Sequence, residues 1–119
     1  MTDAQNPPTP PPGLRFDASG LIPVIAQCAD SGAVLMMAWM TPDTLAETLA
    51  SGQMVYYSRS RNCRWRKGET SGNTQQCLAL TADCDGDTIL AKVRQKGAAC
   101  HTGKPSCFFN NLPPPIAKP

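Results

Sequence analysis

The sequence has no long apolar run and little net charge, and these absences exclude several classes of protein. No stretch approaches the roughly 20 consecutive apolar residues that a membrane-spanning helix needs. No basic segment followed by an apolar one opens the chain, as a secretion signal would require. The formal net charge is +2 in 119 residues, so the overall charge does not favour a nucleic-acid partner. We therefore expect a cytoplasmic protein with neither a membrane nor a nucleic-acid partner.

Proline is concentrated at the two ends of the chain. Nine of the twelve prolines lie in residues 7–12 and 113–119, where they favour an extended or disordered chain. We expect a disordered proline-rich tail over residues 1–13, one folded domain over residues 14–109 and a proline-rich C-terminal tail over residues 110–119. A domain of fewer than about 100 residues buries a modest core, so a metal ion or a second subunit would add needed stability.

Six cysteines are present, and the lack of a secretion signal decides how they are interpreted. In a small secreted protein an even number would indicate disulfide bonds, but a reducing cytosol disfavours them. Metal binding or burial as free thiols is the better prediction. Three of the six have no potential metal ligands grouped around them in the sequence, and we expect them to be buried thiols: Cys28, Cys63 and Cys77.

Apolar runs and turn residues predict an α+β fold of mostly antiparallel strands with one main helix. Residues 21–27 and 33–39 are apolar runs on either side of an Asp-Ser-Gly sequence, which is typical of a hairpin. Pro23 favours an edge or irregular position for the first of these strands. Thr41 suits a helix N-cap, and Gly52 suits a left-handed cap at the helix end. Further strands are predicted at residues 54–58, 74–82 and 88–95.

An acidic motif, Asp83-Cys84-Asp85-Gly86-Asp87, offers hard oxygen ligands. If the backbone is extended there, the period of two places the three aspartates on one face and Cys84 on the other. Neighbouring carboxylates repel one another, and a divalent cation such as Mg²⁺ would keep all three ionised. A solvated acidic turn is an equally good interpretation of the motif alone.

Thirteen residues after the acidic motif, Cys100 and Cys107 offer softer sulfur ligands. Their spacing is wider than that of structural zinc knuckles, so the pair alone is an incomplete site. With Cys84 they make three thiolates, and three protein ligands plus a water molecule are the arrangement of a catalytic zinc. His101 is the only histidine of the chain. It suits three roles equally: a fourth ligand, a general base for that water, or a structural hydrogen-bonding residue.

Residues 57–73 concentrate hydrogen-bond donors of the kind that bind phosphate, namely arginines, hydroxyls and backbone amides beside glycines. An exposed basic strand and loop is the simpler interpretation of any single residue here. A small zinc-binding RNA module, with Tyr57 and Trp65 as stacking platforms, is a further alternative, but Glu69 and the low net charge count against it. A purely structural zinc protein would need four closed ligands.

Several longer motifs accompany these ligand patterns. Residues 67–73 read Lys-Gly-Glu-Thr-Ser-Gly-Asn, and residues 100–103 read Cys-His-Thr-Gly. Together with the acidic motif and with the Tyr-Ser-Arg-Ser-Arg run at residues 57–61, they closely resemble the phosphoribosyl-AMP cyclohydrolase family of histidine biosynthesis. The resemblance covers nearly the whole predicted domain. Two positions depart from the pattern: Phe109, where a tyrosine is often seen, and Arg66, where some members have histidine.

The resemblance implies a hydrolase that opens the adenine ring of N1-(5-phosphoribosyl)-AMP, with water adding at C6 and the bond from N1 to C6 breaking. It also implies an intertwined homodimer in which each zinc site is completed across the two subunits. Ligands of two metals carry over onto this chain: Cys84, Cys100 and Cys107 for zinc, and Asp83, Asp85 and Asp87 for magnesium.

Our mechanistic hypothesis is that a zinc-bound water, deprotonated with help from His101, attacks C6 of the purine. The substrate carries two phosphoryl groups, and the polar segment in the middle of the chain would hold it. The candidate substrate-binding residues are Arg59, Arg61, Trp65, Lys67, Glu69, Thr70, Ser71 and Asn73.

Overall fold

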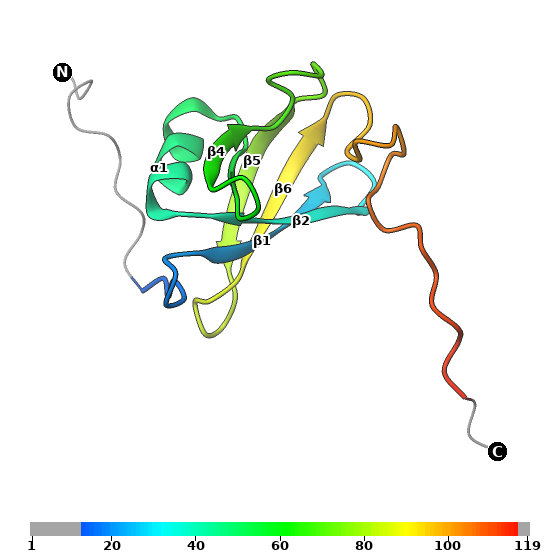
Figure 1. Cartoon of the computed structure of the whole chain (residues 1–119), viewed down its shortest axis with the longest axis horizontal. Coiled ribbons are helices and arrows are strands. Elements are labelled where there is room, and N and C mark those ends of the chain that lie inside the picture. Colours follow the sequence, from blue (N-terminus) through cyan, green and yellow to red (C-terminus); the bar gives the residue numbers. More distant parts are fainter. Residues whose placement is uncertain (1–12, 117–119) are drawn as a thin grey trace.

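The computed structural model describes residues 13–116, which form a curled six-stranded sheet with one helix (Figure 1). The predicted α+β class is confirmed. The predicted N-terminal tail, apart from Gly13, and the last three residues of the predicted C-terminal tail lie outside the described residues. The elements in chain order are β1 (Ile22–Cys28), β2 (Val34–Met40), α1 (Pro42–Ser51), β3 (Val55–Ser58), β4 (Cys63–Arg66), β5 (Gln75–Ala82) and β6 (Ile89–Gln95).

Helix α1 begins and ends where the sequence predicts. At its start, the Thr41 hydroxyl accepts a hydrogen bond from the Thr44 amide at 3.1 Å, and the Thr44 hydroxyl accepts one from the Thr41 amide at 3.0 Å. This reciprocal capping satisfies amides that have no partner inside the helix. Gly52 ends the helix with a φ of 75°, a left-handed conformation that glycine adopts without steric cost.

Thr48 joins the buried side of α1 to β3. Its hydroxyl donates to the Thr44 carbonyl at 2.9 Å and accepts from the Val55 amide at 3.0 Å, and its side chain is fully buried. The helix therefore packs on the β2–β3 part of the sheet through polar as well as apolar contacts.

The sheet is mixed, with the strand order β4-β3-β2-β1-β6-β5. The predicted β1–β2 hairpin is confirmed, and four of the five strand pairings are antiparallel. The fifth is parallel: β6 inserts beside β1, pairing Val24 with Ile89. The edge position favoured by Pro23 is therefore wrong. Pro23 is tolerated because pairing with β6 begins only at Val24, so one side of the strand has no partner at the proline.

Strand β4 was not predicted, because the sequence shows no apolar alternation there. Its four residues are mostly exposed, and only Trp65 is half-buried, with its ring 5.2 Å from that of Tyr56. The strand exists because it pairs with β3 across a tight turn, in which Asn62 adopts a φ of 54°. Cross-strand pairing, rather than local sequence, sets this element.

One apolar core lies between the sheet and the helix. Its largest fully buried apolar side chains come from β1, β2, β3, β6 and the residue before β3: Ile22, Val24, Met40, Met54, Tyr56 and Val93. Within residues 13–116, no helix is long and apolar enough to cross a membrane.

Candidate active site

Strand β6 separates two functional segments. The acidic turn, which we define as residues 83–88, joins β5 to β6, and the cysteine loop, residues 96–107, follows β6. A seven-residue strand such as β6 spans roughly 20 Å. The two segments therefore lie at opposite ends of the sheet, as Figure 1 shows for the loops before and after β6. Within one chain, Cys84 cannot reach Cys100 or Cys107.

A pocket of about 240 Å³ forms where the donor loop, residues 67–73, meets the cysteine loop. It contains six of the eight predicted substrate-binding residues together with His101. Arg66 and Gly68 also line it, and neither was predicted to bind the substrate. We call it the donor pocket; its lining residues are Arg61, Trp65, Arg66, Lys67, Gly68, Glu69, Thr70, Ser71 and His101.

The donor loop is a compact turn after β4. The Glu69 carboxylate accepts a hydrogen bond from the Arg66 amide at 2.6 Å, and the Glu69 amide donates to the Arg66 carbonyl at 3.0 Å. Gly68 has a φ of +85°, and a Cβ there would lie 2.6 Å from the backbone of Asn73. Glu69 is therefore used to build the loop, which explains a carboxylate in a pocket otherwise rich in donors.

The remaining two predicted substrate-binding residues lie outside the donor pocket. The Arg59 guanidinium stacks 4.5 Å from the centroid of the Trp39 ring and lines a neighbouring hollow that shares Trp65 with the donor pocket. Asn73 packs against Gly97, where a Cβ would collide with the Asn73 side-chain oxygen. The structure thus gives Asn73 a role in joining two loops.

Lys67 links the donor loop to the cysteine loop. Its ammonium group donates to the Ala99 carbonyl at 2.8 Å, next to Cys100, and only 9% of its surface is exposed. Burial lowers the pKa of Lys67, while the thiols of Cys100 and Cys107 act in the opposite direction. A cation held among these groups favours the thiolate form of both cysteines.

The two thiols of the cysteine loop have different surroundings. The Thr102 hydroxyl donates to the Cys100 sulfur at 3.0 Å, and this bond is the main reason that the pKa of Cys100 is lowered. Burial raises the pKa of Cys107, as does its neighbour Cys100. The loop is fixed to β2 by the Cys107 amide, which donates to the Leu35 carbonyl at 2.7 Å. The two sulfurs are thus held side by side.

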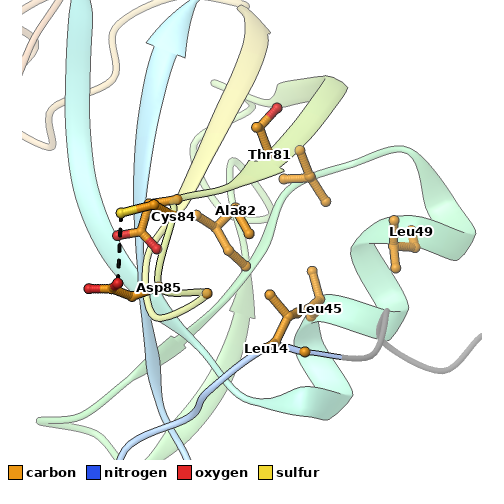
Figure 2. A pocket seen from close by; sticks show the side chains of 12 residues that line it. Leu14, Leu45, Leu49, Thr81, Ala82, Cys84 and Asp85 are labelled. Atoms are coloured by element: carbon orange, nitrogen blue, oxygen red, sulfur yellow. Dashed lines mark hydrogen bonds between the residues drawn. The ribbon is translucent and has the colours of Figure 1, made fainter.

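The acidic turn is not extended, and the predicted separation of Cys84 from the aspartates is wrong. The Asp83 amide donates to the Thr88 carbonyl at 2.9 Å, and the Asp83 carboxylate accepts from the Asp87 amide at 3.1 Å, so the chain reverses direction. The Cys84 sulfur lies 3.7 Å from a carboxylate oxygen of Asp85, on the same side of the turn (Figure 2). Period-two geometry fails because these residues form the hairpin connection itself.

Hydrogen bonds also set the charge of the acidic turn. Desolvation acts to raise the pKa of the exposed Asp83 carboxylate, but the hydrogen bonds that it receives from the turn outweigh this effect and lower the pKa. The carboxylate of Asp83 is therefore ionised and already partly engaged by the backbone. Among residues 13–116, no three histidine, cysteine, aspartate or glutamate side chains are arranged to hold a metal ion together. Neither end of β6 therefore holds three potential metal ligands in one group.

The acidic turn borders an apolar groove of about 520 Å³ between α1 and the β5–β6 hairpin. Leu14, Leu45 and Leu49 face this groove, and Cys84 and Asp85 lie at its margin (Figure 2). The groove is larger than the donor pocket, but it offers few groups that could bind a phosphate. Its apolar lining is more suited to protein than to nucleotide.

All six cysteines are free thiols. The prediction of burial is wrong for Cys63, which is exposed on β4, while Cys28 and Cys77 are half-buried. Strand β4 explains the error, since it lies at the edge of the sheet and covers little of the core.

Comparison with known proteins adds independent information. The family model described as "Phosphoribosyl-AMP cyclohydrolase" matches residues 36–109. A protein of that name from Rhodospirillum rubrum is 63% identical over 101 residues, which cover 85% of this chain and 71% of the relative. Another from Alkalilimnicola ehrlichii is 59% identical, covering 83% and 70%, and one from Paramagnetospirillum magneticum is 56% identical, covering 85% and 76%.

Proposed function

Because the chain belongs to the phosphoribosyl-AMP cyclohydrolase family, we propose that it is the hydrolase of histidine biosynthesis that opens the adenine ring of N1-(5-phosphoribosyl)-AMP between N1 and C6. The observation that carries the proposal is the donor pocket. It places His101 in one pocket with the cations Arg61, Arg66 and Lys67 and with hydroxyl groups of the kind that bind phosphate. The location in the cytoplasm stays a prediction.

The donor pocket and its neighbouring hollow together suit a substrate with a phosphoryl group at each end. Arg61 and Lys67 supply positive charge in the pocket, and Arg59 supplies it in the hollow. Trp65 lies on the boundary between them and offers a face for a planar ring. We therefore assign the hydroxyls of Thr70 and Ser71 to a phosphoryl group, with the reacting ring nearer to His101.

Cys100 and Cys107 of one copy, with Cys84 of a second copy, are the proposed zinc ligands. The donor set fits this metal, because the two loop sulfurs lie together beside the Lys67 ammonium group. The length of β6 supports a shared site, because a single chain keeps Cys84 far from the pair. When bound, zinc acts as a Lewis acid that lowers the pKa of its water ligand to about 7.

His101 is the proposed general base. It is exposed at the mouth of the donor pocket and belongs to the loop that carries both cysteines. An imidazole there can accept the proton of the attacking water and then return it to the ring nitrogen that leaves. No other histidine exists in the chain to take this role.

Asp83, Asp85 and Asp87 are the proposed magnesium ligands. Carboxylate oxygens suit this hard cation, which also keeps several of its own waters. The fit is partial, since Asp83 is engaged by the turn backbone and the three groups do not converge. Coordination would therefore require rearrangement of the exposed Asp85 and Asp87 side chains, or oxygen atoms of the substrate.

The proposed partner is a second copy of this chain. Charge supports the pairing: the acidic turn carries three carboxylates and no cation, whereas the cysteine loop carries Lys96 and Lys104 and no carboxylate. The apolar groove beside Cys84 gives a surface for such a contact. Co-expression of Cys84→Ser and Cys107→Ser copies with different tags tests this. Activity should return only in the mixed dimer, and its absence there would refute a shared site.

The direct test of the function is turnover of phosphoribosyl-AMP by the purified, zinc-loaded chain, followed by product absorbance. We expect turnover that a zinc chelator removes and that added zinc restores. A zinc-loaded protein without turnover would exclude the proposed function.

A further inference from the structure

A hydrogen-bonded chain of polar residues extends from the core to the donor loop and the cysteine loop. Tyr56 and Gln75 are fully buried, and the Tyr56 hydroxyl donates to the Gln75 side-chain oxygen at 2.6 Å. Gln75 then donates from its amide nitrogen to the side-chain oxygen of Gln95 at 2.8 Å. Gln75 and Gln95 are paired across β5 and β6, so their side chains share one face of the sheet.

The chain ends on backbone carbonyls from both loops. The Gln95 amide nitrogen lies within hydrogen-bonding distance of four carbonyl oxygens, two at the end of the donor loop and two at the start of the cysteine loop: Asn73 at 3.2 Å, Thr74 at 3.3 Å, Lys96 at 3.0 Å and Ala98 at 3.4 Å. A glutamine amide has two hydrogens, so these acceptors share them. One side chain therefore holds the two loops together.

The donor and the acceptor are determined for each hydrogen bond that links Tyr56, Gln75, Gln95 and the loop carbonyls. The carbonyls can only accept, so Gln95 must present its nitrogen to them and its oxygen to Gln75. Gln75 must then present its own oxygen to Tyr56. Burial raises the pKa of Tyr56, so its hydroxyl stays protonated and remains a donor. A buried chain with every member satisfied is rigid, and loss of one member leaves its neighbours unpaired.

The other contacts between the two loops do not replace this chain. The Lys67 ammonium group reaches Ala99, the Lys96 amide donates to the Thr74 carbonyl at 2.9 Å, and Asn73 packs on Gly97. Each of these contacts joins one point of one loop to one point of the other. Gln95 differs from these contacts because it lies in neither loop, bonds to both, and is anchored in the core through Gln75.

We propose that Gln95 is a positioning residue that sets the donor loop relative to the cysteine loop, and so places the bound phosphoryl group relative to His101. The consequence for catalysis rests on the proposed function, whereas the effect on the loops does not. Gln95 does not line the donor pocket, and its hydrogen bonds go to none of the proposed metal ligands. Its effect is to keep the two walls of the donor pocket in register, and a misplacement of about 1 Å in an active site lowers a rate about 100-fold.

The test compares Gln95→Met with Thr48→Val by hydrogen–deuterium exchange. Methionine matches glutamine in length but cannot donate. Thr48→Val also removes a buried hydrogen bond, but between α1 and β3, and neither Thr48 nor its partners belong to either loop. We expect peptides covering residues 67–73 and 96–107 to exchange faster in Gln95→Met and at the wild-type rate in Thr48→Val. Wild-type exchange of both loops in Gln95→Met would overturn the proposal.

Kinetics supply the second measurement. With loop alignment lost, kcat for Gln95→Met should fall about 100-fold with a smaller change in KM, because each loop keeps its own groups, while Thr48→Val should keep the wild-type kcat. Equal kcat values for wild type and Gln95→Met would contradict the proposal. If the wild type has no ring-opening activity, the proposed function fails, but the exchange measurement still decides the role of Gln95.

A milder variant covers the case in which Gln95→Met does not fold. Tyr56→Phe removes one hydroxyl and leaves Gln95 in place, so loop exchange should rise, though less than in Gln95→Met. If both variants fold, Tyr56→Phe should add little to the effect of Gln95→Met, because both act through one chain. Loop exchange at the wild-type rate in Tyr56→Phe, or fully additive effects, would refute a connected chain.

Discussion

The two ends of β6 differ in how they are held. The acidic turn before the strand is stabilised mainly by its own hydrogen bonds, with one bond from the Arg15 amide to Gly86 at 2.7 Å. The cysteine loop after the strand is bonded to Lys67 and to β2, which are distant in sequence, and to Gln95, which is anchored through Gln75 of β5. The contrast teaches that the sulfur pair is organised by the whole fold, whereas the carboxylates are organised locally and remain adjustable.

The largest expected effect comes from a substitution in the cysteine loop, at the end of β6 that the whole fold organises. Cys100→Ser should reduce bound zinc and lower turnover to background, because the sulfur pair loses one member. Cys63→Ser is the matched control, since Cys63 is an exposed thiol on β4. Zinc content by metal analysis and turnover are measured together. Full zinc content in Cys100→Ser would remove this residue from the ligand set.

His101→Asn tests the proposed general base of the cysteine loop and leaves the sulfurs of Cys100 and Cys107 in place. We expect kcat to fall about 100- to 10,000-fold, the usual contribution of a general base, while zinc content stays at the wild-type level. Zinc analysis and steady-state kinetics check this result. Loss of zinc in this variant would instead identify His101 as a ligand, and unchanged kcat would leave it without a catalytic role.

Glycine substitutions sharpen the comparison between the two ends. Gly68→Ala should destabilise the fold by about 1–3 kcal/mol and raise KM, because its Cβ would strike the Asn73 backbone beside the donor pocket. Gly86→Ala, which would strike Gly13 beside the acidic turn, should destabilise without raising KM. Gly32→Ala isolates the cost of positive φ, since it has open space around it. Chemical unfolding and KM are the measurements. Equal KM values for the first two variants would contradict the assignment of the donor pocket.

The smallest effect is expected from the charge of Arg64, which lies in neither the acidic turn nor the cysteine loop. Arg64 pairs with Glu47 on α1, and the two side chains are 50% and 41% exposed. Such surface pairs contribute less than about 1 kcal/mol. Arg64→Ala should therefore change the free energy of unfolding slightly and leave KM unchanged. A large rise in KM would place Arg64 in substrate binding, although it does not line the donor pocket.

Sequence patterns predicted this fold best where a local rule applies. The capping residues Thr41 and Gly52 located the helix, and the Asp-Ser-Gly turn located the first hairpin. The same reasoning failed for β4 and for the interior position of β1, because both depend on which distant strand pairs with them. Parallel pairing of β1 with β6 has no signature in either strand alone.

The candidate site was predictable in composition but not in arrangement. The polar motif at residues 67–73 and the cysteine loop were identified by residue type, and the fold brings them together. The prediction for the acidic turn was wrong because it applied the side-chain alternation of a strand to residues that connect two strands of a hairpin. Gln75 and Gln95 were missed. A polar residue at an inward position of an alternating strand was the available signal, and it gains meaning only when its partner across the sheet is known.

The parallel pairing of β1 and β6 also constrains how the chain is made. Strand β1 cannot pair on both of its sides until β6 has left the ribosome. Strands β2 and β3 and helix α1 can assemble with it earlier. Contacts between segments so far apart in sequence form late and slow folding. A nascent or truncated chain lacking β6 would present the open edge of β1, an apolar strand, as a template for aggregation. Biosynthesis of this small enzyme therefore depends on its last strand.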